Sequence, residues 1–336
     1  KKKKLREAYG SAKEIYYIEE TQLRLQNFLT KKDIEQLKIA RKQKDLEEKY
    51  YNMEEKGIDF VPYFQKTYPK RLSELDAAPY ALYVKGKLPD ASKLSIAVVG
   101  ARNCTPYGRD MARMFSYRLA AAGVFVISGM ALGIDGWGHQ GALEAGGETY
   151  AVLGSGVMRC YPSCHQNLYE SIVRHGGVIS EFPVYARAKP VFFPMRNRII
   201  SGLSDGILVV EAREKSGSLI TADAALEQGK DVFVIPGRIG DELSVGCNRL
   251  IRMGAVPVLT PDDILDYYGV KTSDGSQNVN ETEQKILAFL GGKTMHMDEI
   301  SAGLSLPMTQ LLKCMIVLQK KGYVIEVGRN FFMKKI

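Results

Sequence analysis

The chain has 336 residues, of which 45% are hydrophobic and 25% charged, a composition typical of a globular protein with two or three domains and not of a fibrous or disordered one. The net charge of +8 favours an anionic partner. The central part of the sequence is nearly neutral, however, so binding there requires a local groove. No apolar run is long enough to span a bilayer, and none follows the lysine-rich start, so we expect a cytoplasmic protein without membrane contact.

Residues 1–56 are predicted to form a small helical domain. Leucine and isoleucine recur there at a spacing closer to a helix than to a strand, among charged residues of both signs. Thr30 followed by Asp33 is typical of a helix start. From Gly57 to about Asp90 the sequence becomes rich in aromatic residues and proline, which predicts an irregular segment packed against the next domain.

Seven short apolar runs follow, each ending in small residues and most separated by helical stretches. Continuous apolar runs of this kind are typical of strands buried on both faces, so residues 57–270 are predicted to form an α/β domain with a parallel sheet. Ligands of such sheets bind beyond the carboxyl ends of the strands. Glycines at those ends favour a binding groove there. The runs are LSIAVVG, VFVISG, TYAVLGSG, GGVISEF, GILVVEA, DVFVIPG and AVPVL, and the glycines are Gly100, Gly129, Gly154, Gly156 and Gly237.

The end of the chain is predicted to form a further domain. Residues 271–281 are polar and without apolar periodicity, which predicts a linker. Residues 282–336 contain three helical patterns and then a hairpin pattern around residues 327–330. Three helices and a hairpin favour a winged helix. Such modules bind DNA or other proteins, and the fold alone does not choose between them.

The segment FFPMRNRIISG, residues 192–202, combines aromatic, cationic and amide side chains at a predicted helix start. Pro194 suits the first turn of a helix, where free N–H groups form a natural anion site. Phe192 and Phe193 offer stacking faces for bases. Arg196 and Arg198 point about 200° apart on a helix, so we expect one to face DNA, slightly favouring Arg196, and the other to pair with a carboxylate such as Glu181, Glu211 or Asp205. Asn197 can bond either the loop beneath it or DNA.

Other loops offer few groups for catalysis or for cofactor binding. Neither the dinucleotide fingerprint nor a phosphate-binding loop of the G-x-x-x-x-G-K type is present, so we predict no cofactor. Arg102 is placed to hold a phosphate, with an ion pair to Glu181 or Glu211 as the alternative. Asp135 and His139 lie four residues apart, and we expect a hydrogen-bonded pair that fixes the loop more than a catalytic pair.

The cysteines and one neighbouring histidine give little support for a metal site. The five cysteines are an odd number without C-x-x-C spacing, so we expect reduced thiols. Cys160, Cys164 and His165 lie close in sequence, but structural zinc takes four ligands and no fourth lies nearby. We therefore predict no metal site.

Ordered motifs over about residues 58–266 make the chain resemble the DNA processing protein A (DprA, also called Smf) family. The resemblance implies an extended Rossmann-like domain and a non-enzymatic protein that binds single-stranded DNA, dimerises and helps load the RecA recombinase in natural transformation. It also implies a set of DNA contacts: Arg102, Gly129, Gly154, Ser155, Gly156, Lys189, Phe192, Arg196, Asn197 and Arg198. The motifs are AVVGAR, SGMALGIDGWGHQGAL, AVLGSG followed by YP, GGVISEFP, FFPMRNRIISGLSDGILVVEA, SGSLITADAALEQGKDVFVIPG and GCNRLIRMGA.

One position departs from the family pattern, and two other functions stay open. Many members have a basic residue after Tyr161-Pro162, where this chain has Ser163. A nucleoside-monophosphate phosphoribohydrolase has a similar fold, but Thr221 stands where such an enzyme needs its carboxylate. A dimeric scaffold that binds duplex DNA through the winged helix is the second alternative.

Overall fold

The computed structural model describes residues 1–42, 45–270, 280–291, 293–320 and 323–334. The chain forms two compact units, Lys1–Val270 and Lys271–Ile336. Most of the predicted linker, residues 271–279, lies outside the described residues. Within the described ranges no single helix is long and apolar enough to cross a membrane, although one sharply bent pair, Met297–Leu304 with Met308–Gln319, meets the length and composition that a broken span requires.

The first unit is built around a nine-stranded sheet in the order β1-β2-β6-β5-β4-β3-β7-β8-β9. The strands from β6 across to β9 are parallel. These parallel strands coincide with the seven apolar runs, so the predicted α/β fold is confirmed. Their bounds are β3 Ser95–Val99, β4 Phe125–Ser128, β5 Thr149–Val152, β6 Gly177–Ser180, β7 Gly206–Val209, β8 Asp231–Val234 and β9 Val256–Pro257.

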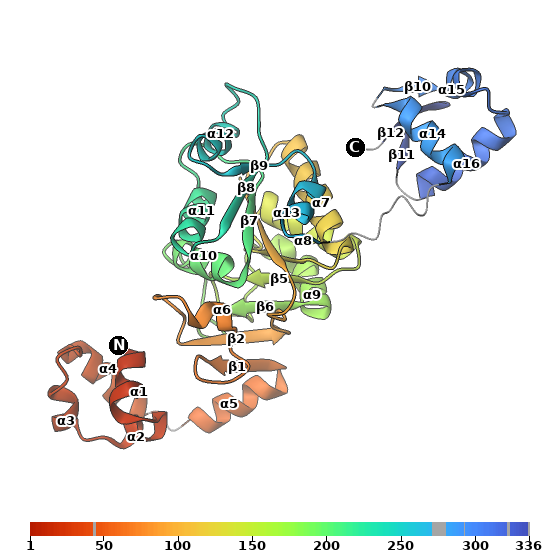
Figure 1. The fold of residues 1–336 in the computed structure, drawn as a ribbon. Coiled ribbons are helices and arrows are strands. Elements are labelled where there is room, and N and C mark those ends of the chain that lie inside the picture. The colour runs from red at the N-terminus through yellow and green to blue at the C-terminus, as the bar shows by residue number, and fades with distance from the viewer. Residues whose placement is uncertain (43–44, 271–279, 292, 321–322, 335–336) are drawn as a thin grey trace. The chain divides into compact units, whose positions relative to one another are not determined.

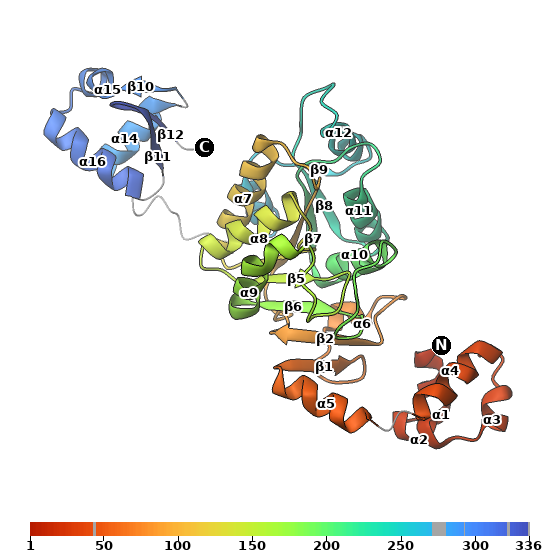
Figure 2. The same cartoon turned by 180° about the vertical axis from the view of Figure 1, so that it is seen from behind.

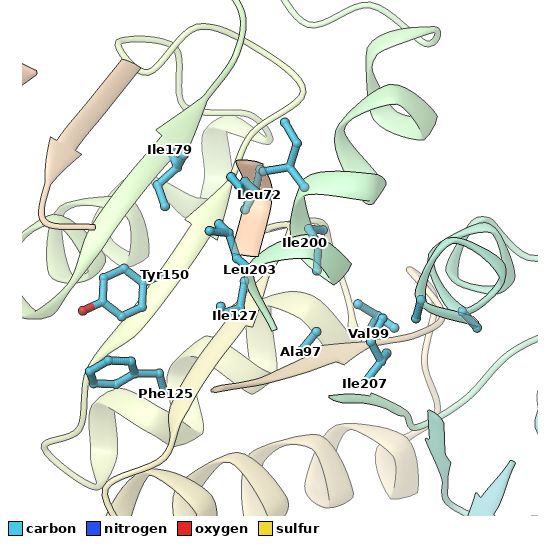
Figure 3. Close-up of a cluster of buried hydrophobic side chains, with 14 of the residues drawn as sticks. Leu72, Ala97, Val99, Phe125, Ile127, Tyr150, Ile179, Ile200, Leu203 and Ile207 are labelled. Carbon is cyan, nitrogen blue, oxygen red and sulfur yellow. The ribbon is translucent and has the colours of Figure 1, made fainter. Parts of the chain in front are cut away.

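Helices cover both faces of the sheet (Figures 1 and 2). Alternate residues of each strand point to opposite faces, so Ala97 and Val99 pack on one layer while Ile96 and Val98 pack on the other. Figure 3 shows the first layer, where Ile200 and Leu203 of α10 meet the sheet. One layer contains α6 Lys70–Ser73, α10 Phe192–Leu203, α11 Gly217–Glu227 and α12 Val245–Arg252; the other contains α7 Pro106–Ala121, α8 Ile134–Glu144, α9 Gln166–His175 and α13 Pro261–Tyr267, with a short 3₁₀ turn at Ser163–His165 before α9.

The prediction of an irregular segment from Gly57 to Asp90 is wrong. β1, Ile58–Pro62, and β2, Ala81–Gly86, pair antiparallel with each other, and β2 pairs antiparallel with β6. Few of their residues are buried. Leu82 and Val84 of β2 alternate with more exposed neighbours, and two exposed residues separate Ile58 from Val61 in β1, so neither strand has a continuous apolar run. Proline and aromatic residues around them masked this weaker pattern.

The start of the chain is helical as predicted. The first four helices share a small core of Leu5, Leu23 and Ile34, whereas Met53 of the fifth helix packs against the cluster that contains Ile58 of β1. Thr30 and Asp33 form a reciprocal capping box at the start of α4, which confirms the predicted helix start. The helices are α1 Lys2–Tyr9, α2 Ala12–Tyr17, α3 Glu20–Arg24, α4 Lys31–Arg41 and α5 Leu46–Glu55.

The second unit contains the three predicted helices and the predicted hairpin. A short additional strand, β10, pairs with β12, so the sheet has the order β10-β12-β11. Buried side chains including Ile286, Ile300 and Leu311 give the unit its own core. A winged helix remains our interpretation of this arrangement. The elements are α14 Glu281–Leu290, β10 Met295–His296, α15 Met297–Leu304, α16 Met308–Lys320, β11 Val324–Gly328 and β12 Phe331–Lys334.

Candidate nucleic-acid interface

A cavity of about 610 Å³ lies at the carboxyl ends of the central strands, and we call it the edge cavity. After β3 the chain continues to β4 on one side, and β7 pairs with β3 on the other, so the strand order changes direction here. Open α/β sheets bind their ligands at such a point. The lining residues are residues 99–103 after β3, Ala131, Asp135, Tyr161, Pro190, five residues of α10 (Phe193, Pro194, Arg196, Asn197, Ile200), Arg213, Lys215–Ser218, Ile220, Thr221 and Leu243.

One wall of the edge cavity combines aromatic rings with a cation. The ring centroids of Phe193 and Tyr161 lie 5.6 Å apart with their planes tilted by 41°. The guanidinium carbon of Arg102 lies 5.3 Å from the centre of the Phe193 ring. Arg102 and Tyr161 are exposed, and Phe193 is half-buried. Aromatic faces beside an arginine are the groups that bind single-stranded nucleic acid without sequence preference.

The ion pair considered as an alternative for Arg102 is not formed. Glu181 pairs with Arg198, and Glu211 accepts a hydrogen bond from the backbone N–H of Thr105 at 2.9 Å. Both candidate carboxylates therefore have other partners, and Arg102 lies at the cavity.

Phe192 occupies a different environment from its neighbour. Its ring stacks on that of Phe182, with centroids 4.0 Å apart and an interplanar angle of 20°. The ammonium group of Lys189 lies 5.6 Å from the centre of the Phe192 ring. Phe182 is buried and Lys189 is exposed at the rim, next to the lining residue Pro190. Phe193, which our list of DNA contacts omitted, therefore has the better position for stacking, and a DNA contact of Phe192 stays a prediction.

Arg196 lies at the inner side of the cavity and is only 4% exposed. Its Nη1 donates a hydrogen bond to the carbonyl of Val152, and its Nε has no partner among the described residues. Burial lowers the pKa of Arg196 to about 10, and the nearby carboxylate of Asp135 opposes this shift. Arg196 therefore stays charged at neutral pH. A Cβ at Gly129 would overlap its guanidinium, which explains the glycine at the end of β4.

Arg198 points away from the edge cavity. Its guanidinium pairs with Glu181, one of the three carboxylates expected as a partner for one of the two arginines. Arg196 and Arg198 thus point in different directions, as expected of two residues that helix geometry turns about 200° apart, and a DNA contact of Arg198 stays a prediction. Asn197 Nδ2 donates to the carbonyl of Gly217 at 3.2 Å, so it bonds the adjoining loop and fixes α10 against the start of α11.

The glycine-rich loop after β5 packs against protein atoms. A Cβ at Gly154 would lie 2.8 Å from the Phe193 ring, and one at Gly156 would lie 2.1 Å from the carbonyl oxygen of Pro183. The hydroxyl of Ser155 donates to the carbonyl of Arg159 at 2.8 Å. All three residues are buried. The structure thus gives each a packing role, and their direct contact with DNA stays a prediction.

Asp135 and His139 do not form the expected pair. The Asp135 carboxylate accepts hydrogen bonds from the N–H groups of Gly129 at 3.2 Å and Ala131 at 3.4 Å. Burial raises the pKa of Asp135, and the Arg196 charge acts in the opposite direction. His139 Nδ1 instead lies 2.7 Å from the hydroxyl of Thr149. Asp135 therefore fixes the loop after β4 without help from His139, which belongs to the core.

The opposite wall of the edge cavity comes from the loop between β7 and α11. Ser216 caps α11 by accepting from the N–H of Ser218, and the two hydroxyl oxygens lie 2.8 Å apart. Arg213 and Lys215 are exposed beside them. None of the DNA contacts predicted from the sequence lies between Arg213 and Ser218. A Gly-Ser loop that follows a buried strand and begins a helix is the sequence signal that could have drawn attention to this wall.

The cysteine and histidine residues considered as metal ligands have separate contacts. Cys160 donates to the carbonyl of Pro162, and Nδ1 of His165 lies 3.1 Å from the carbonyl oxygen of Met130. Across the described ranges no three His, Cys, Asp or Glu side chains gather in a way that suits a metal ion.

A family comparison places residues 59–269 in the family of DNA recombination-mediator protein A. The chain is 36% identical to Protein Smf of Escherichia coli strain K12 over 301 residues, which are 86% of this chain and 80% of that protein. It is 37% identical to the DNA processing protein DprA of Bacillus subtilis strain 168 over 240 residues, which are 69% of this chain and 81% of that protein.

Two solved structures have similar folds. DNA processing protein A of Streptococcus pneumoniae matches with a TM-score of 0.61 and 33% identity, over 74% of this chain and 89% of that one. DNA processing protein A of Helicobacter pylori, described for its unique single-stranded DNA binding mode, matches with a TM-score of 0.56 and 27% identity, over 63% of this chain and 95% of that one.

Proposed function

This chain belongs to the family of DNA recombination-mediator protein A, and we propose that it binds single-stranded DNA at the edge cavity without catalysing a reaction. The observation that carries the proposal is the wall of Arg102, Phe193 and Tyr161 at the sheet edge. Unpaired bases expose the flat faces that such rings stack on, whereas bases in a duplex do not. The single-stranded DNA binding described for the Helicobacter pylori protein supports the same ligand.

A non-catalytic role is supported by the chemistry of the cavity. Among the described residues that line it, Asp135 is the one carboxylate, and it accepts hydrogen bonds from two backbone N–H groups. Thr221, which stands where the hydrolase alternative needs a carboxylate, is buried in the lining. Release of free base from nucleoside monophosphates by the purified protein would favour the hydrolase instead.

We further propose that the protein acts in the cytoplasm in natural transformation, as a homodimer that helps load RecA onto the bound strand. This part of the proposal is supported by family membership. Co-purification of RecA with the protein on single-stranded DNA, and the molar mass of the free protein in solution, are the measurements that test it.

The DNA site is tested with Arg102→Ala and Lys189→Ala, titrated with single-stranded and duplex oligonucleotides at two salt concentrations. We expect preferential binding of single strands by the unaltered protein. Each variant should bind more weakly, and its slope of log affinity against log salt should fall by about 0.7, because one phosphate contact is lost. Arg174→Ala, an exposed arginine on α9, is the matched control. Unchanged affinity and slope in both site variants would contradict the site.

A further inference from the structure

The first turn of α8 carries an exposed aromatic ring that does not line the edge cavity. Trp137, the single tryptophan of the chain, is 38% exposed, although tryptophan is highly buried on average in folded proteins. It lies two residues beyond Asp135, which does line the cavity, and helix geometry turns the two side chains about 200° apart. The Trp137 ring therefore lies outside the cavity, on another face of α8.

Arg109 of α7 lies beside this ring. Its guanidinium carbon is 5.7 Å from the centre of the Trp137 ring. The helices α7 and α8 lie side by side (Figure 2), and a Cβ at Gly141 of α8 would lie 2.2 Å from a backbone carbonyl oxygen of α7, so glycine allows the two helices to approach closely. The motif GWGHQGAL thus places an aromatic ring next to a cation, the same combination as Phe193 and Arg102 in the edge cavity.

The charge of Arg109 is accessible to a phosphate. Its side chain is 44% exposed, and its Nε donates to the carboxylate of Asp110 at 2.9 Å. Asp110 is itself exposed, and an ion pair between exposed side chains contributes little to stability. Within the described ranges no hydrogen bond occupies the terminal nitrogens of Arg109. A strand phosphate can therefore approach this guanidinium without breaking a buried contact.

The loop between β4 and α8 connects Trp137 to the edge cavity. Ala131 lines the cavity, and the following residue, Leu132, is 45% exposed. A Cβ at Gly133 would lie 2.4 Å from the carbonyl oxygen of the cavity residue Arg102. The N–H of Trp137 donates to the carbonyl of Gly133 at 3.1 Å. One helical turn thus separates Trp137 from the loop that touches Arg102, so a single strand can contact both places.

We propose that Trp137 and Arg109 form a second base-binding position, on which a strand that leaves the edge cavity stacks a further base. The inference rests on the proposed binding of single-stranded DNA and extends that site over the first turns of α7 and α8. Stacking on an aromatic ring tolerates any base, and the cation beside the ring attracts the phosphate of the strand.

The single tryptophan makes this position directly observable. Oligothymidylates of about 4 to about 16 nucleotides, the range of site sizes for single-strand grooves, are titrated in parallel by anisotropy and by tryptophan emission. We expect long strands to quench the emission of Trp137 and to shield the ring from acrylamide, because a base covers it. The midpoint should coincide with that of the anisotropy titration. The shortest strands, which occupy the edge cavity first, should quench less at saturation.

Four variants test the contribution of the position to affinity. Trp137→Ala should weaken the binding of the longest strand by about 5- to 150-fold, the worth of one stacked base, and Trp137→Phe should recover part of this loss. The loss in Trp137→Ala should grow with strand length, whereas Phe193→Ala should weaken strands of every length. Arg109→Gln should lower the slope of log affinity against log salt by about 0.7. Tyr117→Ala, at an exposed aromatic residue further along α7, is the matched control and should leave affinity unchanged.

The outcomes separate this inference from the proposed function. Binding by anisotropy without a change in Trp137 emission or in its access to acrylamide overturns the second position and leaves strand binding at the edge cavity intact. That measurement uses the unaltered protein, so it decides the matter even if Trp137→Ala does not fold. Unchanged affinity of a folded Trp137→Ala for the longest strand also overturns the position. No binding of any strand, in contrast, contradicts the proposed function itself.

Discussion

Two adjacent phenylalanines show how much the function depends on single side chains. Phe193 lies at the edge cavity beside Arg102, whereas Phe192 stacks on the buried Phe182. We expect Phe193→Ala to weaken the binding of single-stranded DNA by about 1 to 3 kcal/mol with little change in its salt dependence, as is typical of stacking. Fluorescence anisotropy at two salt concentrations measures both quantities.

Phe192→Ala is the control for this prediction. Loss of its stack on Phe182 should lower the free energy of unfolding by about 0.5 to 1.5 kcal/mol beyond the loss from reduced burial, with a smaller effect on DNA affinity. The reverse order of the two DNA effects would return the stacking role to Phe192.

A second residue, His139, makes stability depend on pH. The His139 side chain is fully buried. The Thr149 hydroxyl donates its own proton to the Val126 carbonyl, so it accepts a hydrogen bond from Nδ1 of His139. Its Nε2 has no partner among the described residues, and burial lowers the pKa of His139 from 6.5 to about 3. Below pH 6.5 the unfolded chain therefore binds a proton that the folded chain does not. The free energy of unfolding should fall by up to about 1.4 kcal/mol per pH unit between pH 6.5 and 3.

Denaturant unfolding at pH 7.5 and pH 5.0 measures this effect. The difference between the two pH values should be about 2 kcal/mol smaller in His139→Gln than in the unaltered protein. His175→Gln, at an exposed position, should keep the full difference. An unchanged difference in His139→Gln would show that other groups cause the loss of stability in acid.

Sequence reasoning located the loops of the candidate site but not the direction of their side chains. Arg102 lines the edge cavity because strand ends in a parallel sheet meet at one edge, and Arg196 of α10 lines the same cavity. Which of two adjacent phenylalanines faces the cavity is set by about 100° of helix rotation and by partners far away in sequence, such as Phe182 and Tyr161. The packing roles of Gly154 and Gly156 could not be predicted either, because a glycine that packs against protein and one that packs against a ligand look the same in a sequence.

At the scale of elements, the antiparallel pair β1 and β2 is part of the folded core. Leu82 of β2 is fully buried among residues that include Leu72 of α6 and Ile179 of β6. We expect Leu82→Ala to lower the free energy of unfolding by about 2 to 5 kcal/mol, because it removes buried methyl groups and leaves a cavity. Trp137, the single tryptophan of the chain, lies on α8 and reports unfolding of this unit by fluorescence.

Lys70→Ala on α6 is the matched control, since Lys70 is exposed and its loss should change stability by less than about 0.5 kcal/mol. An effect of Leu82→Ala as small as that of the control would mean that β1 and β2 unfold separately from the rest of the sheet.

The elements differ in how well sequence predicts them, and burial is the reason. The parallel strands from β6 across to β8 are covered on both faces, so their sequences are continuous apolar runs that stand out. β1 has only two buried positions, Ile58 and Val61, and the two residues between them are exposed, so its sequence shows no apolar periodicity. The Thr30–Asp33 cap was predictable because its hydrogen bonds are local and need no tertiary partner.

At the scale of the whole molecule, the two compact units allow the DNA-binding activity to be assigned to one of them. Residues 1–270 contain the edge cavity and its own hydrophobic layers, and the second unit has a separate core. We expect a chain that ends at Val270 to bind single-stranded DNA within about threefold of the full chain, with a similar salt slope, because the cations of the edge cavity remain. Anisotropy titrations of both chains measure this.

The same titrations with duplex DNA test the scaffold alternative, in which the second unit binds duplex and the first only dimerises. That alternative requires a preference for duplex DNA that disappears when residues 271–336 are removed. It also requires Arg102→Ala to leave DNA affinity unchanged. Our proposal requires Arg102→Ala to weaken single-strand binding equally in the full and the shortened chain, because Arg102 acts beside Phe193 within the first unit. A shortened chain that folds, as its Trp137 fluorescence can establish, yet binds no single strand would move the DNA site out of the edge cavity.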